Sequence, residues 1–257
     1  MDRALLLYSG YGNSMTKTGV STVIGELMLT AGVILLLFSF YEAYWTNLES
    51  GKLQDKANEK LDTQWHNPRG KLKPELGEAF ARMYIPTFGS DFHFAVLEGT
   101  EDEDLLRGPG HYADTQMPGE LGNFGVAGHR VGKGAPFNDL GNLETCDAIV
   151  IETQTEWITY RVMPIDGVQA DCFTPEQQAK PEYQGINGRH ITLPDDGAVI
   201  NPIPGMDTPV EQASEALLTL TTCHPQFSNA ERMIVHAMEV GHEPKVKGQT
   251  PAVLEES

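Results

Sequence analysis

Residues 218–224 read LTLTTCH, the most informative run in the chain. Leucine alternates with threonine, the period-two pattern of a β-strand with one face in a core. The strand ends abruptly at Cys223, which opens a turn containing His224 and Pro225. A cysteine with a purely structural role is expected inside an apolar run, whereas Cys223 lies at the edge of a strand. Taken alone, Cys223 is either a structural thiol or a nucleophile.

Short strands of the same kind continue along the chain, separated by Gly and Pro turns. We expect them at residues 81–85, 92–97, 124–127, 148–153, 157–163, 190–193, 216–222 and 233–240. Many short strands with regular turn signals and little helical periodicity indicate an antiparallel barrel, closed or nearly closed. The sequence therefore predicts a mainly β domain over residues 80–240. The polar tail at 241–257 is expected to be mobile.

An apolar segment near the N-terminus has the length of a membrane span. Residues 18–41 contain Glu26 as their one charged side chain. A bilayer core needs about 20 mostly apolar helical residues, which this segment supplies. An aromatic belt of Tyr41, Tyr44 and Trp45 marks its end, and no small-residue cleavage pattern follows. We therefore expect an uncleaved transmembrane anchor, with a buried core helix as the alternative.

Charges beside this segment indicate its orientation. Arg3 and Lys17 precede it and carboxylates follow it, which favours the N-terminus inside and the bulk of the chain outside. Residues 1–17 are then a short cytoplasmic N-terminus at the plasma membrane. Residues 42–79 are expected to be a polar juxtamembrane spacer, partly helical, because apolar residues recur every four positions at Leu53, Ala57, Leu61 and Trp65.

Charge and cysteine usage exclude several classes of function. The formal net charge is −18 and no basic stripe exists, so nucleic-acid binding is not expected. Three cysteines are too few for a disulfide scaffold or a paired zinc site. We expect Cys146 and Cys172 to be ordinary buried thiols, with a disulfide between them as the alternative. Neither a cofactor nor a metal is predicted, because Cys223, His224 and His236 lack a clear fourth ligand.

Arg232 has the chemistry that a reactive thiol needs from a neighbour. The thiolate is the reactive form, and because a free cysteine has a pKa of about 8.5, it needs a cation or a base nearby. Arg232 follows Cys223 by nine residues and offers a fixed charge with a fork of donors. The alternative is a surface arginine paired with Glu231 or Glu239.

His129 is the candidate base. It lies in the glycine-rich turn after the strand expected at 124–127, where an imidazole is easily presented. Other histidines compete with it for this role, namely His111, His224 and His236. A thiol, a base and a fixed cation, each at a strand edge, are the components of a cysteine acyl-transfer site.

Two separate runs resemble the sortases, the membrane-anchored cysteine transpeptidases of Gram-positive bacteria. LTLTTCHPQFSNAERMIVHA at 218–237 is similar to the family signature TLxTC with an arginine about nine residues on. NFGVAGHRVGKGAPFNDL at 123–140 is similar to the histidine segment of the family. The resemblance implies an eight-stranded closed sortase β-barrel behind one transmembrane helix. It also implies that Cys223, His129 and Arg232 are catalytic.

Finer detail resembles class E, the actinobacterial housekeeping type, through GPGHYADTQMPGELGNFGVAGHR at 108–130. Class E sortases prefer LAXTG to LPXTG signals, and Tyr112 matches a tyrosine associated with that choice. Thr222 and His224 are the other substrate contacts that we expect. The implied substrates are secreted proteins with a C-terminal sorting signal, cleaved between Thr and Gly through a thioacyl intermediate. The implied acceptor is a peptidoglycan precursor amine.

Two other enzymatic functions and one departure from the family pattern stay open. A membrane-tethered cysteine protease would use the same three residues for hydrolysis, and a pilus-polymerising sortase is a related alternative. Such pilus enzymes usually carry a lid motif before the barrel, which is not found at residues 47–80. Where relatives often have Gly-Asp after the histidine segment, this chain has Cys146-Asp147.

Overall fold

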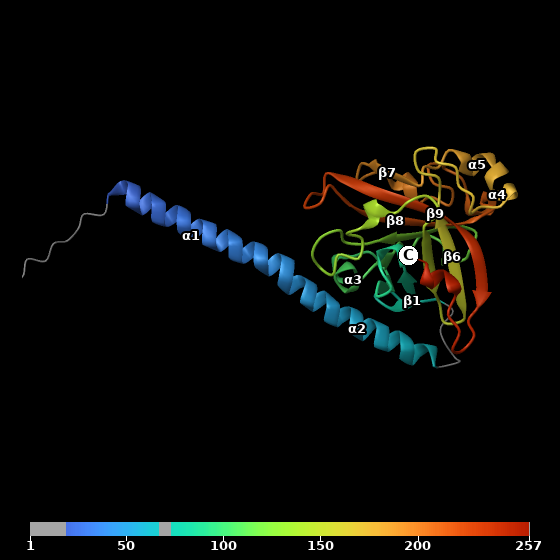
Figure 1. Ribbon diagram of the computed structural model, residues 1–257, viewed down its shortest axis with the longest axis horizontal. Coiled ribbons are helices and arrows are strands. Elements are labelled where there is room, and N and C mark those ends of the chain that lie inside the picture. The colour runs from blue at the N-terminus through green and yellow to red at the C-terminus, as the bar shows by residue number, and fades with distance from the viewer. Residues whose placement is uncertain (1–18, 67–72, 257) are drawn as a thin grey trace, which may run out of the picture. The chain divides into compact units, whose positions relative to one another are not determined.

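The computed structural model describes residues 19–66 and 73–256 (Figure 1). The chain divides after Tyr41 into two compact units. In the first, α1 (Val20–Phe40) is a 21-residue helix of mean hydropathy 2.2 with no buried residue, which makes it a candidate membrane span by length and composition. The aromatic residues that were expected to form a belt are exposed in a π-helical turn, η1 (Tyr41–Trp45). The predicted cytoplasmic N-terminus, 1–17, lies outside the described residues.

The second unit contains a closed β-barrel. Its strands run in the order β6-β5-β1-β2-β3-β4-β8-β9, and β6 pairs with β9 to close the ring, while β7 pairs with the first half of β9. The predicted eight-stranded barrel is therefore confirmed. The strands are β1 (Ala79–Tyr84), β2 (His93–Glu98), β3 (Gly110–His111), β4 (Gly122–Ala127), β5 (Ala148–Glu152), β6 (Glu156–Val162), β7 (Arg189–Thr192), β8 (Ala216–His224) and β9 (Glu231–Pro244).

Short helices connect these strands. The long segment between β6 and β7 contains two of them, α4 and α5, and lies at the end of the barrel marked by those labels in Figure 1. In chain order the connecting helices are η2 (Pro86–Phe88), α3 (Asp102–Arg107), η3 (Leu140–Asn142), α4 (Pro175–Ala179), α5 (Pro181–Gln184), η4 (Gly197–Ile200) and η5 (Val210–Gln212), and η6 (Ala252–Glu255) follows β9.

Not all strand pairs are antiparallel, so that part of the prediction was wrong. β4 pairs with β8 in parallel along its whole length, and β2 pairs in parallel with the two-residue strand β3. Alternating hydrophobicity marks a strand and its buried face, but it says nothing about which strand becomes the neighbour. β9 also runs to Pro244, four residues beyond its predicted end.

The barrel interior fixes which side chains of β8 and β9 face outward. Leu218 and Leu220 of β8 pack in the main core cluster, and Met233 and Val235 of β9 join them. Because successive side chains of a strand point to opposite faces, the residues between them face the outside of the barrel. The outward set is Thr219, Thr221 and Cys223 on β8, and Arg232, Ile234 and His236 on β9.

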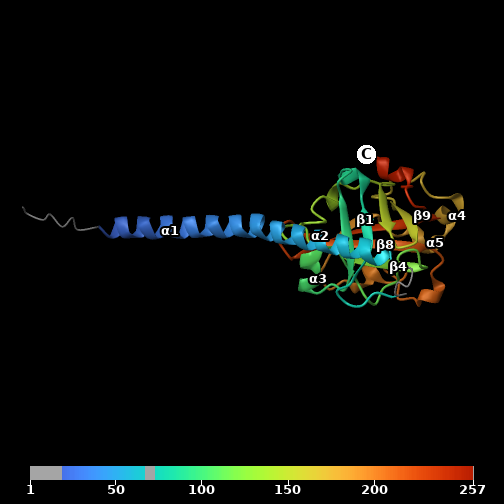
Figure 2. The same ribbon diagram turned by 90° about the horizontal axis from the view of Figure 1, so that it is seen from below.

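Helix α2 (Thr46–Trp65) packs on the barrel instead of serving as a free spacer (Figures 1 and 2). The helix was predicted, but its buried face is more polar than expected: Ser50, Gln54, Ala57 and Leu61. The Gln54 amide bonds both backbone groups of Ala95, accepting from its N–H at 2.9 Å and donating to its carbonyl at 3.2 Å. A side chain that satisfies both backbone groups of a strand residue fixes the helix at that point.

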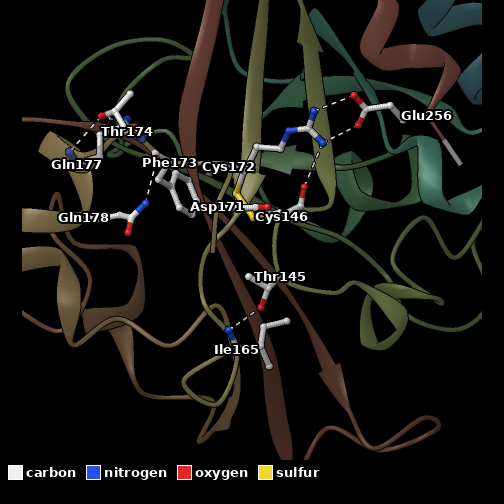
Figure 3. Close-up of a disulfide and its surroundings, with 11 residues drawn as sticks. Thr145, Cys146, Ile165, Asp171, Cys172, Phe173, Thr174, Gln177, Gln178 and Glu256 are labelled. Carbon is white, nitrogen blue, oxygen red and sulfur yellow. Dashed lines mark hydrogen bonds and ion pairs between the residues drawn. A yellow bond between two sulfur atoms is a disulfide. The ribbon is translucent and has the colours of Figure 1, made fainter. Parts of the chain in front are cut away.

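Cys146 and Cys172 form a disulfide with their Cα atoms 5.8 Å apart (Figure 3), so the expectation of two free thiols was wrong. The bond ties the chain just before β5 to the segment between β6 and α4. Cys146 has φ +72°, in the left-handed region that favours glycine. A glycine, which the family resemblance leads us to expect at this position, adopts such a conformation without strain.

The C-terminal tail is held against the barrel, contrary to its expected mobility. Arg161 of β6 donates two hydrogen bonds to Glu256, at 2.6 and 2.9 Å. Pro251 is buried, and η6 packs near β5. A bidentate guanidinium–carboxylate pair has a defined geometry, so it orients the tail as well as attracting it.

Candidate active site

The end of β8 places Cys223 opposite Arg232. In the antiparallel ladder between β8 and β9, Cys223 is the direct partner of Arg232. Directly opposed residues project from the same face with Cβ atoms about 4.5–5.5 Å apart. Cys223 is free and half-buried, so its thiol combines accessibility with partial shielding from solvent. Arg232 donates through Nη1 to the carbonyls of Asn229 and Glu231, at 3.3 and 3.0 Å, which braces the guanidinium over the turn.

The histidine segment is hydrogen-bonded to the same end of β8. Gly128 donates its N–H to the Thr221 carbonyl at 3.0 Å, and the Thr222 hydroxyl donates to the Gly128 carbonyl at 2.7 Å. Gly128 must be glycine, because a Cβ there would lie 2.5 Å from the Phe137 ring. His129 therefore leaves β4 beside the last residues of β8, and the parallel pairing brings the predicted histidine and cysteine segments together.

The environment of His129 favours its neutral form. Burial lowers the pKa of His129, the nearby Lys133 ammonium lowers it further, and Asp102 opposes both by raising it. Its Nε2 is buried and has no hydrogen-bond partner among the described residues. A buried ring nitrogen without a partner costs free energy in the folded chain, which marks His129 as a residue whose role needs an explanation beyond packing.

Arg130 is a site residue that sequence reasoning missed. Its Nη1 lies 3.4 Å from the Cys223 carbonyl and 2.6 Å from Nδ1 of His224. Because a guanidinium only donates, Nδ1 of His224 is the acceptor. The Asn138 side chain donates to the Arg130 carbonyl at 2.8 Å and holds this residue from the other side. Arg130 thus joins the histidine segment to the cysteine strand; its position directly after His129 was the available signal.

Tyr112 lies against the outward face of β8, where its hydroxyl is 2.9 Å from Oγ1 of Thr221. Thr221 precedes Cys223 by two residues on that face, so the two side chains are about 7 Å apart along the strand. A cavity of about 620 Å³ opens beside Tyr112 and is also lined by Ala113, Asp114 and Ile200. The lining of this cavity includes none of Thr221, Cys223, His129 and Arg232, so the cavity adjoins Tyr112 but does not reach the thiol.

The two other predicted substrate contacts lie differently from what was expected. Thr222 is 3% exposed and its hydroxyl is used by Gly128, so it supports the histidine segment instead of facing a substrate. His224 is half-buried between Arg130 and Glu231, whose carboxylate is 4.0 Å from Nε2. Alternation along β8 puts its side chain on the face opposite to Cys223.

The competing histidines are occupied elsewhere. His111 is buried against Glu98, at 2.7 Å from Nδ1, and His236 is buried with Nδ1 2.8 Å from the Thr219 hydroxyl. Burial, with a smaller effect of His190, lowers the pKa of His236 to about 3. Within residues 19–66 and 73–256, no group of three or more His, Cys, Asp or Glu side chains is placed to hold a metal ion.

Comparison with known proteins decides the family. Residues 83–240 match the sortase domain. The chain belongs to the sortase family. Sortase SrtE2 of Streptomyces coelicolor is 30% identical over 90% of this chain and 86% of its own length. Sortase SrtE1 of the same organism is 34% identical over 91% of this chain, which spans 61% of that protein. The predicted likeness to class E sortases is thereby confirmed.

Solved structures confirm the sortase barrel. SrtF sortase from Corynebacterium diphtheriae is 61% identical, with a TM-score of 0.70 over 74% of this chain and 98% of that one. Sortases are cysteine transpeptidases, and the TLxTC cysteine of this sortase is Cys223. Its strand, its arginine partner and its histidine segment are the parts that the fold brings together.

Proposed function

We propose that this sortase is a membrane-anchored transpeptidase whose nucleophile is Cys223, whose acid and base is His129, and whose oxyanion-binding cation is Arg232. The observation that carries the proposal is the direct cross-strand pairing of Cys223 with Arg232, beside a histidine segment hydrogen-bonded to the same strand end. These three groups supply a thiolate, a proton donor and a fixed positive charge on one face of the barrel.

The substrate in this proposal is a secreted protein with a C-terminal LAXTG- or LPXTG-like sorting signal. The Cys223 sulfur bonds to the threonine carbonyl carbon, and the bond to the glycine nitrogen breaks as protonated His129 gives its proton to the leaving amine. An acceptor amine, that of a cell-wall precursor, then attacks the thioester. His129 takes the amine proton, and the Cys223 thiolate leaves.

The pKa of His129 affects both halves of this reaction. With ordinary pKa values of about 8.5 and 6.5, thiolate and imidazolium coexist in on the order of 1% of molecules at pH 7. Burial lowers the His129 pKa and reduces that fraction. The same shift makes the imidazolium a stronger acid towards the leaving amine and keeps the neutral base abundant for the second step. We therefore expect slow turnover that is limited by the first step.

The disulfide supports an extracytoplasmic location for the barrel, with the N-terminus inside and residues 18–41 in the bilayer. Cys146 and Cys172 are bonded, and such bonds persist in oxidising compartments. We further propose that Tyr112 selects alanine over proline at the second signal position, because its hydroxyl reaches Thr221, two residues before Cys223 on β8.

The test is a peptide-transfer assay with the full chain in detergent, an LAXTG peptide and an added amine. We expect Cys223→Ala to lose on the order of 10³-fold or more of the rate and Arg232→Ala on the order of 10²-fold. Arg107→Ala, which removes a cation on α3 that donates to the Gly77 carbonyl, is the control. Full activity in Cys223→Ala or Arg232→Ala would sink the proposal.

The same assay discriminates transfer from hydrolysis. A product that does not change when the amine is added favours a cysteine protease. For the signal preference, Tyr112→Phe removes only the hydroxyl that contacts Thr221. We expect the ratio of LAXTG to LPXTG rates to fall in this variant, and an unchanged ratio excludes a role of that hydroxyl in selection.

A further inference from the structure

The loop that follows His129 has an unusual backbone. Four consecutive residues have positive φ: Gly132 at 63°, Lys133 at 50°, Gly134 at 79° and Ala135 at 41°. Lys133 and Ala135 carry a Cβ, and residues of this kind rarely adopt the left-handed region. A conformation of this sort persists only where the surrounding structure holds it in place. Because this loop directly follows His129, the contacts that hold it also affect where the imidazole lies.

The first turn of α2 supplies such contacts. Oδ1 of Asn47 accepts a hydrogen bond from the Gly134 N–H at 2.9 Å, and the Thr46 hydroxyl accepts one from the Lys133 N–H at 3.4 Å. A Cβ on Gly134 would lie 2.7 Å from the Ser50 hydroxyl, so the helix touches the loop backbone directly. Positions 46, 47 and 50 lie on one side of a helix, because residues three and four apart are neighbours.

The helix is itself firmly held, so it can serve as a support. Ser50 is 1% exposed and donates to the Leu106 carbonyl at 2.8 Å. Gln54 bonds both backbone groups of Ala95, and Leu61 is fully buried. Further along, Oδ1 of Asn58 accepts a hydrogen bond from Nε of Arg82 at 2.8 Å. The contacts to the loop and the contacts to β1 and β2 come from different turns of α2.

We propose that the first turn of α2 positions the catalytic histidine: Asn47, together with Thr46 and Ser50, holds the loop after His129 in its working conformation. These are positioning residues, since they act through His129 and touch no reacting atom. The inference rests on the proposed role of His129 as acid and base. It makes the juxtamembrane helix a part of the catalytic apparatus of this sortase instead of a tether.

The charge in the loop gives the contact a second consequence. The Lys133 ammonium is one cause of the lowered His129 pKa. Releasing the loop lets Lys133 move away from the imidazole, while Asp102 on α3 stays in place. Loss of the contact therefore disturbs the placement of the imidazole and the charge around it together.

The test compares variants of α2 in the full chain, in detergent. Asn47→Ala removes the acceptor for the Gly134 N–H. Asn47→Asp retains a side-chain oxygen at the same position. Asn58→Ala is the matched control, an identical substitution on the same helix that removes the contact with Arg82 and leaves the loop alone. Hydrogen exchange of the Gly134 amide is measured beside kcat and KM for transfer of an LAXTG peptide.

We expect Asn47→Ala to raise the exchange rate at Gly134 and to lower kcat, each about five-fold, the effect of one neutral hydrogen bond. KM is expected to stay unchanged. Asn47→Asp and Asn58→Ala are expected to stay within about two-fold of the wild type in both measurements, because neither removes an acceptor from the loop.

Three outcomes overturn parts of this picture separately. Unchanged exchange at Gly134 in Asn47→Ala shows that the helix does not hold the loop. If Asn47→Ala raises the exchange rate at Gly134 but its kcat equals that of the wild type or of Asn58→Ala, the contact does not serve catalysis. If the wild type transfers no peptide, the proposed function fails and the catalytic part of this inference fails with it, while the exchange data still decide whether α2 holds the loop.

Discussion

Cys146 occupies a backbone position that favours glycine, and this conformation predicts how the chain responds to losing its disulfide. The bonded cysteines are 26 residues apart. Closing a loop of that length in the unfolded chain corresponds to about 3.5 kcal/mol at 25 °C. The Cys172→Ser, Cys146→Ala double variant is therefore expected to lose about 3.5 kcal/mol of unfolding free energy.

Replacing Cys146 by glycine is expected to cost less unfolding free energy than replacing it by alanine. At φ +72°, a Cβ costs about 1–2 kcal/mol, and the greater freedom of glycine in the unfolded chain takes back about 0.5–1 kcal/mol. The Cys172→Ser, Cys146→Gly variant should then be more stable than its alanine counterpart by about 0.8 kcal/mol, the difference between the midpoints of these two ranges. If residue 146 had an ordinary extended conformation, the glycine variant would be the less stable of the two.

Urea unfolding of the full chain in detergent, followed by tryptophan fluorescence, measures these differences. Cys223→Ala is the control, because it removes a thiol that has neither a disulfide nor a positive φ. A Cys172→Ser, Cys146→Ala variant as stable as the wild type under oxidising conditions refutes the contribution of the disulfide. Equal stability of the glycine and alanine variants refutes the strain at residue 146.

Two further predictions concern buried polar groups beneath the site. The pKa of His236 is about 3 in the folded state and 6.5 in the unfolded chain, so stability is complete above pH 6.5 and falls as pH drops from there towards 3. Between pH 7 and pH 5, His236 alone is expected to lower the free energy of unfolding by about 2 kcal/mol. In urea unfolding, His236→Asn should lose about 2 kcal/mol less unfolding free energy between pH 7 and pH 5 than the wild type does. The exposed control His93→Asn should lose as much as the wild type. Equal losses in the two variants would count against the lowered pKa of His236. Thr222→Val leaves the buried Gly128 carbonyl without its donor and should cost about 1–3 kcal/mol, whereas Thr63→Val, which loses an exposed hydroxyl bond on α2, should cost less than about 0.5 kcal/mol. Similar costs in the two threonine variants would exclude a special role of the Gly128 contact.

Local patterns were enough to identify the strand that carries Cys223 and the face of that strand in the core, although the strand continues to His224. Alternation of leucine and threonine indicates both, because side chains of a strand point alternately to two faces. The TLxTC run with Arg232, and the histidine segment, were enough for the family because each is a continuous run of residues. The candidate anchor was equally local, being one apolar helix long enough for a bilayer.

Other features depended on which segments become neighbours. The parallel pairing of β4 with β8 and the link from Arg130 to Cys223 join residues that are about 90 positions apart in sequence. The docking of Gln54 on Ala95 matches a polar side chain to a strand backbone, and hydrophobic periodicity carries no signal for that. The disulfide cannot be derived from local patterns, because two cysteines in a sequence do not show whether their Cα atoms approach.

Local runs of residues therefore predict the groups of the proposed site, namely a thiol, an arginine and a histidine, together with one apolar helix. How these groups are held became visible in the three-dimensional arrangement of the chain. The cross-strand register sets Cys223 against Arg232, and the first turn of α2 reaches the loop after His129. Residue type and spacing specify what a side chain can do. The contacts that position it involve backbone groups of distant segments, and apart from proline every residue carries the same backbone donor and acceptor, so they leave no signal in the sequence.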